Sequence, residues 1–435
     1  MTITGLEHRG SDLDREGPGC ATPSQVGASF LTLPGQEAVA LQAVAGHNGA
    51  IVRVEIGEPA NHSVRRGDSR AFGPGDVVVY RGPWSRGERM ELLKRLCEAS
   101  GAPGFEDRIR AIFRSEIEPY VDRIETDGLG NVIAIREGRG DHPRKVMLAG
   151  HMDEIGFVVT HIDDKGFLRL QPLGGFDPKT LIAKRVRVIN AQQQDIIGVI
   201  GSKPIHIMTD DERKKLPEIK DLFVDIGLPP AEVKKLVDIG DPVTLYQDCI
   251  QVGNRWSGKS MDNRVSIYTL IETLKRVKSR EVSIYAVATS QEEIGVRGAT
   301  TAAHRIQPDM GVAIDVTLAC DLPSAKPEEY ISTLGQGVAI KILDSSAISN
   351  PKLVRHFRDL AKKHEIPHQL EILPRGGTDA AGIQRGGDAV PAITLSVPTR
   401  YVHSVVETID GRDLEATVAL LTAFLETAHT VDLSY

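Results

Sequence analysis

Residues 146–154 read VMLAGHMDE: four apolar residues, then a glycine, a histidine, a methionine and two acids. A continuously apolar run is typical of a strand that helices cover on both faces of a mainly parallel sheet. Similar runs alternate with helical patterns along the chain: strands at 131–135, 282–289, 310–316 and 392–397, and helices at 90–100, 105–117, 263–277 and 413–427. This alternation predicts an α/β fold with three layers, α/β/α.

The composition is that of an ordinary globular protein, with 435 residues, 41% hydrophobic residues and a formal net charge of -7. The negative charge argues against nucleic acid as a partner, because nucleic-acid binding needs a clustered basic face. A membrane span is not expected either, since no run of about 18 apolar residues occurs. Four cysteines lie far apart, which favours a reducing cytoplasm over a disulfide framework: Cys20, Cys97, Cys249 and Cys320.

Residues 1–89 differ in character from the rest of the chain. Residues 1–27 are rich in Gly, Pro, Ser and charge, which is typical of weakly ordered segments. Short alternating runs at Ile51–Ile56 and Val77–Tyr80 instead indicate a small β unit. A further interpretation is that the natural enzyme starts at Met90, and these readings stay open.

A second region, residues 157–245, interrupts the alternation of strands and helices. It has short alternating runs, such as Arg185–Ile189, between turns rich in Gly, Pro and Asp. Such spacing predicts a small β barrel or sandwich. We therefore expect residues 157–245 to form a domain inserted into a larger one made of residues 90–156 and 246–435.

Histidines and acids follow the ends of several predicted strands. Each one alone has a structural explanation, such as helix capping by Asp262 or solvent exposure of the Glu292–Glu293 pair. Together they gather where open α/β sheets bind ligands. A set of nitrogen and oxygen ligands without cysteine suits zinc, cobalt or manganese. The candidates are His151 with Asp153 close by, Asp262, Glu292, Glu293, Asp315 and His403.

From Met90 to the C-terminus the sequence resembles the TET-type dinuclear metal aminopeptidases. This family is also known as glutamyl or deblocking aminopeptidases, and some relatives are named cellulase M or endoglucanase. The motifs that carry the resemblance stand in the family's order: AGHMDEIGF at 149–157, SMDNR at 260–264, ATSQEEIGVRGA at 288–299, IDVT at 314–317, GGTDA at 376–380 and RYVHS at 400–404.

The resemblance implies a role for each candidate residue. Two divalent metal ions per subunit are expected, with His151 and Asp315 on one and Glu293 and His403 on the other. Asp262 would bridge the two ions. By the same resemblance Asp153 would orient His151, and Glu292 would be the general base.

The activity implied is removal of N-terminal residues from short peptides by a hydroxide that two metals share. The inserted domain resembles the family's PDZ-like dimerisation domain. A homo-oligomer built from dimers, such as a tetrahedral dodecamer, follows from this resemblance. The loop Gly376–Asp379 is expected either to cap a helix through Thr378 or Asp379 or to lie at the substrate cleft.

Three other functions remain open at this stage. A related two-metal amidase would remove acyl groups from acylated amino acids. A glycoside hydrolase would need two carboxylates flanking a sugar and no metal. The chain could also be a binding protein that keeps the site without catalysis, although an intact Glu292 argues against this.

Overall fold

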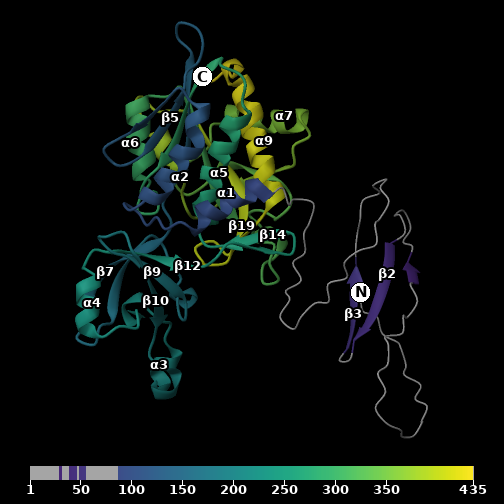
Figure 1. Ribbon diagram of the computed structural model, residues 1–435. Coiled ribbons are helices and arrows are strands. Elements are labelled where there is room, and N and C mark those ends of the chain that lie inside the picture. The colour runs from purple at the N-terminus through teal and green to yellow at the C-terminus, as the bar shows by residue number, and fades with distance from the viewer. Residues whose placement is uncertain (1–28, 32–38, 47–48, 55–86, 435) are drawn as a thin grey trace. The chain divides into compact units, whose positions relative to one another are not determined.

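The computed structural model describes residues 29–31, 39–46, 49–54 and 87–434 (Figure 1). The chain divides into two compact units, Met1–Asp76 and Val77–Tyr435. In the first unit, β1 (Ser29–Leu31), β2 (Val39–Gly46) and β3 (Gly49–Val54) form an antiparallel sheet. The alternating run expected at Ile51–Ile56 thus forms a strand as far as Val54, whereas Val77–Tyr80 lies outside the described residues.

The second unit contains a large mixed sheet, whose described strands follow the order β13-β14-β20-β19-β16-β6-β15-β5-β4, with β17 between β19 and β18. Their bounds are β4 (Arg123–Thr126), β5 (Val132–Arg136), β6 (Arg144–His151), β13 (Ile250–Val252), β14 (Arg255–Gly258), β15 (Val282–Thr289), β16 (Met310–Leu318), β17 (Val338–Leu343), β18 (His368–Ile372), β19 (Ala392–Arg400) and β20 (Glu407–Asp410).

The expectation of a mainly parallel sheet is wrong for its flanks. The four central strands β15, β6, β16 and β19 are parallel. Beyond β15, strands β5 and β4 each pair antiparallel with the preceding strand, and beyond β19 the same holds for β20, β14 and β13. The short connections β4–β5 and β13–β14 explain this difference, because a short turn can join only antiparallel neighbours.

Helices cover both faces of the large sheet. Along β6, Val146 and Leu148 pack into one hydrophobic cluster while Met147 and Ala149 pack into another, as the alternation of side chains along a strand requires. The first cluster includes residues of α1 (Gly87–Glu98), α2 (Asp107–Ile117), α5 (Met261–Arg276), α7 (Pro351–Lys363) and α9 (Gly411–Thr427). The second includes α6 (Arg297–Ile306) and α8 (Asp379–Gln384).

The strands between 156 and 246 do not join the large sheet but close into a barrel (Figure 1). The barrel has a hydrophobic cluster of its own, around Phe157, Val186 and Val224. Its elements are β7 (Gly156–Ile162), β8 (Leu168–Leu173), β9 (Arg185–Ile189), β10 (Asp195–Gly201), α3 (Asp210–Lys214), β11 (Phe223–Asp225), α4 (Pro230–Leu236) and β12 (Pro242–Tyr246).

Among the described residues, none of the helices combines the length and the apolar character that a membrane-spanning segment needs.

Candidate metal centre

A cavity of about 420 Å³ lies past the carboxyl ends of the parallel strands β6, β15 and β16. Six of the seven residues expected at the site line it: His151, Asp262, Glu292, Glu293, Asp315 and His403. The remaining wall is largely apolar or glycine, with Arg375 as the one arginine or lysine among the described lining residues.

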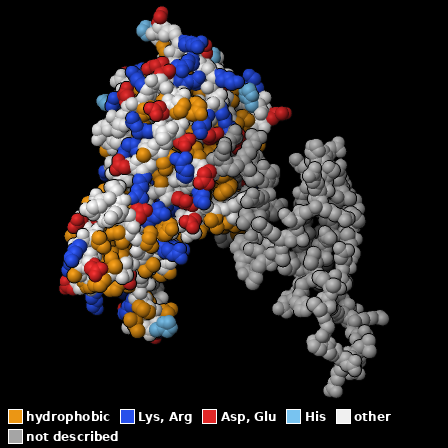
Figure 2. Space-filling view, viewed as in Figure 1, with side chains coloured by type: hydrophobic (Ala, Val, Ile, Leu, Met, Phe, Trp, Pro, Cys, Tyr) orange, Lys and Arg blue, Asp and Glu red, His pale blue; other side chains and the backbone are white. Residues whose placement is uncertain are grey.

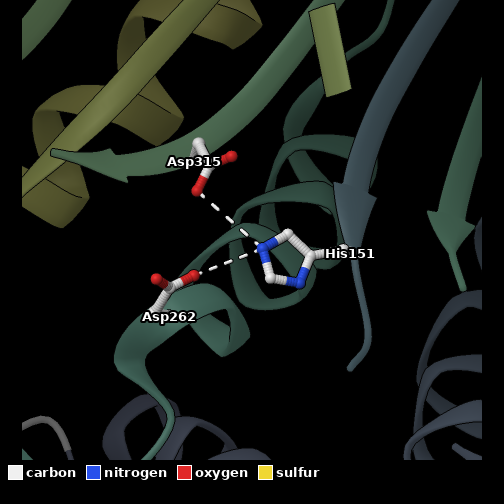
Figure 3. A group of neighbouring side chains, drawn as sticks. All are labelled: His151, Asp262 and Asp315. Carbon is white, nitrogen blue, oxygen red and sulfur yellow. Dashed lines mark ion pairs between the residues drawn. The ribbon is translucent and has the colours of Figure 1, made fainter. Parts of the chain in front are cut away.

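The first group of side chains surrounds His151, the last residue of β6 (Figure 3). Its Nε2 lies 3.2 Å from Asp262 Oδ1 and 4.0 Å from Asp315 Oδ1. The other ring nitrogen, Nδ1, lies 3.0 Å from the backbone oxygen of Asp153 and 3.5 Å from its Oδ1. The Nε2 edge of the imidazole thus faces the cavity, while Asp153 contacts the Nδ1 edge.

The second group surrounds His403, which follows β19. Its Nε2 lies 3.4 Å from Asp262 Oδ2 and 3.5 Å from Glu293 Oε1. Asp262 therefore faces both imidazoles, one with each carboxylate oxygen. In each group the three potential ligand atoms lie within 4.8 Å of one another, which is the spacing needed to hold a metal ion.

Asp153 also organises the two glutamates at the end of β15. Its Oδ1 accepts the backbone N–H of Glu292 at 3.0 Å, and its Oδ2 accepts that of Glu293 at 3.0 Å. The Glu292 side chain reaches the cavity, with Oε2 3.9 Å from His151 Nε2. A single buried carboxylate thus fixes the segment that carries both glutamates.

The two imidazoles respond strongly to the acids around them. Burial by itself lowers the pKa of His151, but contacts with Asp153 and Asp262 raise it well above its usual value. For His403 the effect of burial is likewise overcome by Asp262 and Glu293, which raise the pKa to about 12. The acids around both imidazoles thus favour a cation at this position, and a bound metal ion would supply one.

The carboxylates carry the opposite signature. Burial, followed by the charges of neighbouring acids, raises the pKa of Glu292 and Asp315 well above the usual range and raises that of Glu293. Asp262 is the exception, because both imidazoles offset its burial and lower its pKa. Closely packed buried acids are unfavourable unless cations compensate them. This donor set of carboxylate oxygens and imidazole nitrogens therefore fits divalent metal ions.

The loop Gly376–Asp379 differs in part from expectation. Gly376, Gly377 and Thr378 line the cavity. Helix α8 does begin at Asp379, but neither side chain caps it. Thr378 Oγ1 bonds Asp344 at 3.3 Å, and the Asp379 carboxylate accepts the hydroxyl of Thr289 at 2.5 Å. The capping prediction is wrong because buried side-chain partners compete for these oxygens.

Sequence reasoning missed Glu407, the first residue of β20. Both of its carboxylate oxygens accept backbone N–H groups of residues at the centre, those of Asp262 and His403. Burial, with a contribution from the charge of Asp262, raises the pKa of Glu407 to about 8. No spacing rule relates Glu407 to its partners, so the only signal available was its proximity to His403 in the sequence.

Comparison with known proteins places this arrangement in a family. The family model of M42 glutamyl aminopeptidases matches residues 130–420. The chain belongs to this family. Its members are peptide hydrolases, and the chain is therefore a peptide hydrolase of the M42 group.

Individual relatives agree with this assignment. A putative aminopeptidase of Acetivibrio thermocellus is 39% identical over 335 residues, which cover 77% of this chain and 97% of the relative. An aminopeptidase structure from Desulfurococcus kamchatkensis is 38% identical, with a TM-score of 0.76 over 78% of this chain and 95% of that one. The TET1 peptidase of Pyrococcus horikoshii, which can assemble into a tetrahedron or an octahedral shell, is 33% identical with a TM-score of 0.69, over 77% and 98%.

Proposed function

We propose that this M42 peptidase is a dinuclear aminopeptidase that removes N-terminal residues from short peptides. The observation that carries the proposal is the position of Asp262, whose two oxygens face two separate groups of ligand atoms. The first metal would be held by His151, Asp262 and Asp315. The second would be held by Asp262, Glu293 and His403. Zinc, cobalt and manganese all suit this donor set.

When bound, the two metal ions would activate water and polarise the scissile carbonyl. Glu292 has the position of a general base, because its side chain lines the cavity without belonging to either ligand group. Its raised pKa suits a group that takes a proton from water and passes it to the leaving nitrogen. Asp153 would position His151 through Nδ1 and hold the backbone of Glu292.

The barrel, residues 157–245 in our assignment, is proposed to mediate dimerisation as a PDZ-like domain. Apolar side chains gather on its surface (Figure 2), and the most exposed of the large ones are Leu216, Ile239 and Ile207. Exposed apolar patches of this kind commonly mark protein–protein interfaces. By analogy with the TET1 peptidase, we propose a homo-oligomer built from dimers, such as a tetrahedral dodecamer.

Two further assignments concern the N-terminal residues and the cysteines. Residues 1–89 are proposed to lie outside the catalytic unit, because they precede the family match and because a relative matched over 97% of its own length covers only 77% of this chain. The described cysteines Cys97, Cys249 and Cys320 are free, which fits a reducing compartment such as the cytoplasm.

The experiment that tests the function is hydrolysis of a panel of unblocked and N-acetylated aminoacyl anilides by metal-stripped protein. Zinc, cobalt or manganese would be added back separately. We expect metal-restored cleavage of the unblocked substrates alone. Cleavage of the acetylated substrates would instead support the two-metal deacylase, and full activity without metal would remove the dinuclear mechanism. A cellulose-derived oligosaccharide in the same assay tests the glycoside hydrolase alternative.

A further inference from the structure

Glu407 is a buried acid, 2% exposed, that contacts residues of the metal centre but does not line the cavity. Its Oε2 accepts the backbone N–H of Asp262 at 3.0 Å, and its Oε1 accepts that of His403 at 2.8 Å. Asp262 and His403 are two of the three members of the second ligand group. One carboxylate therefore joins the backbones of two residues that lie far apart in the sequence.

Both N–H groups depend on this acceptor. Asp262 lies in the first turn of α5, where backbone N–H groups have no partner within the helix. His403 has a φ of 62°, a left-handed conformation that costs free energy for a residue other than glycine. The Glu407 carboxylate holds the backbone of each ligand residue where the local chain would not hold it unaided.

The sheet places Glu407 between the two segments. Strand β20 pairs with β14 on one side, where Glu407 lies opposite Gly258, and the chain continues from β14 to Asp262. On its other side β20 pairs with β19, from which the chain continues to His403. Glu407 thus begins the strand that lies between β14, which leads to Asp262, and β19, which leads to His403.

A second buried carboxylate holds other residues of the centre in the same way. Asp153 accepts the backbone N–H groups of Glu292 and Glu293, just as Glu407 accepts those of Asp262 and His403. Glu293, Asp262 and His403 make up the second ligand group. Every residue of that group therefore has its backbone held by one of two buried carboxylates.

We propose that Glu407 is a positioning residue that sets the geometry of the second metal site. It does so by fixing the backbones of Asp262 and His403 relative to each other. The first site depends on it less, because His151 and Asp315 belong to the sheet strands β6 and β16. This inference rests on the proposed dinuclear function.

The test is a calorimetric titration of the metal-stripped full chain with Zn²⁺. The zinc content that remains after dialysis is measured separately. Glu407→Gln keeps the shape of the side chain but replaces one acceptor oxygen by an amide NH₂ group, which cannot accept a hydrogen bond from a backbone N–H. We expect wild type to bind two ions. The variant should bind the second ion about 10–100-fold more weakly, the usual effect of losing a residue that orients metal ligands. The first ion should be weakened clearly less, because Asp262 is the only one of its three ligands that Glu407 holds.

Two further variants separate positioning from general stability. Asp413→Asn is the matched control, because Asp413 is also a buried carboxylate that accepts two backbone N–H groups, those of Gly335 and Gly337, away from the cavity. It should keep both zinc affinities. Glu407→Asp keeps both acceptor oxygens on a shorter side chain and should weaken the second site less than Glu407→Gln does.

Each outcome decides the matter. Wild-type affinity for the second ion in Glu407→Gln, or equal weakening of both sites, would overturn the inference. A wild-type protein that binds two ions but cleaves no unblocked peptide would refute the proposed function and leave the role of Glu407 to the titration. Binding of a single ion by wild type would overturn both.

Discussion

The two histidines of the centre are held in different ways. His151 ends a strand that pairs with β15, and its side chain is 2% exposed. His403 lies in the turn between β19 and β20, in a left-handed conformation, and its side chain is 35% exposed. The sheet itself positions the first imidazole, whereas the second depends on a hydrogen bond from its backbone to Glu407.

We call the ligand group around His151 and the one around His403 the two halves of the centre. Because they are held differently, substitutions in each half should have different effects. A substitution near His151 disturbs the buried sheet and should lower the stability of the whole domain. A substitution near His403 disturbs only a turn and should weaken metal binding while the protein stays folded. Substitutions that break both halves, neither half or one half test this comparison.

The largest effect is expected for Asp262→Ala, because this side chain faces both histidines. Neither group would keep its three ligands. We expect loss of both zinc ions on dialysis and a fall in aminopeptidase activity beyond the roughly 10²–10⁴-fold that loss of a general base causes. Retention of one tightly bound ion would show that Asp262 serves only one half.

Glu292→Gln should leave both halves intact and still abolish most turnover. The side chain belongs to neither ligand group, so zinc content should stay at two ions per chain. We expect kcat to fall by about 10²–10⁴-fold with little change in zinc affinity. If kcat stayed within a few-fold of wild type, Glu292 would not be the base.

Glu154→Gln tests the stability of the His151 half. Glu154 is buried, with Oε1 and Oε2 each 2.7 Å from Lys259 Nζ and Oε1 3.2 Å from Arg264 Nη2. Removing its charge leaves two buried cations without their partner, which typically destabilises a protein by about 3–5 kcal/mol. Denaturant unfolding of the metal-free protein measures this loss, with Asp122→Asn at an exposed ion pair to Arg280 as the control.

The same variant carries a pH signature. Burial alone would raise the pKa of Glu154, but Lys259 and Arg264 lower it below its usual value. Ionised Glu154 therefore contributes stability above its unfolded pKa, about 4.3, and this contribution is lost as pH falls through the lower folded pKa. Glu154→Gln should show a shallower loss of stability in acid than wild type, and an unchanged slope would contradict this assignment.

The smallest effect is expected at Arg375, which belongs to neither half. It is exposed and is the one arginine or lysine among the described cavity-lining residues. Arg375→Glu should change the ratio of activities on glutamyl and lysyl anilides by a few-fold in favour of lysine, as exposed charges contribute about 0.2–1 kcal/mol. An unchanged ratio would place the substrate side chain away from Arg375.

The sequence predicted the central strands closely, because continuous apolar runs such as 282–289 coincide with β15. It did not predict that β17 and β18 extend the sheet beside β19. Strand β18 has the largely polar sequence HQLEI, and the apolar run of β17, VAIKIL, is interrupted by Lys341. The candidate ligands could be named because they lie at or near strand ends, and the structure brings them together. Their binding of metal remains a prediction.

The supporting residues could not be found in this way. The Asp262 N–H that Glu407 accepts comes from 145 residues away in the sequence, and the cations that pair with Glu154 come from 105 and 110 residues away. Such contacts have no fixed spacing, and an isolated glutamate in a sequence looks like any surface acid. The same limit led to the wrong capping role for Thr378 and Asp379.

The most direct test of the dinuclear centre is anomalous diffraction at the zinc absorption edge, from crystals of the wild-type protein grown with zinc. We expect two peaks about 3.5–4 Å apart with Asp262 between them, one beside His151 and Asp315 and the other beside Glu293 and His403. A single peak, or two peaks that Asp262 does not join, would contradict this expectation.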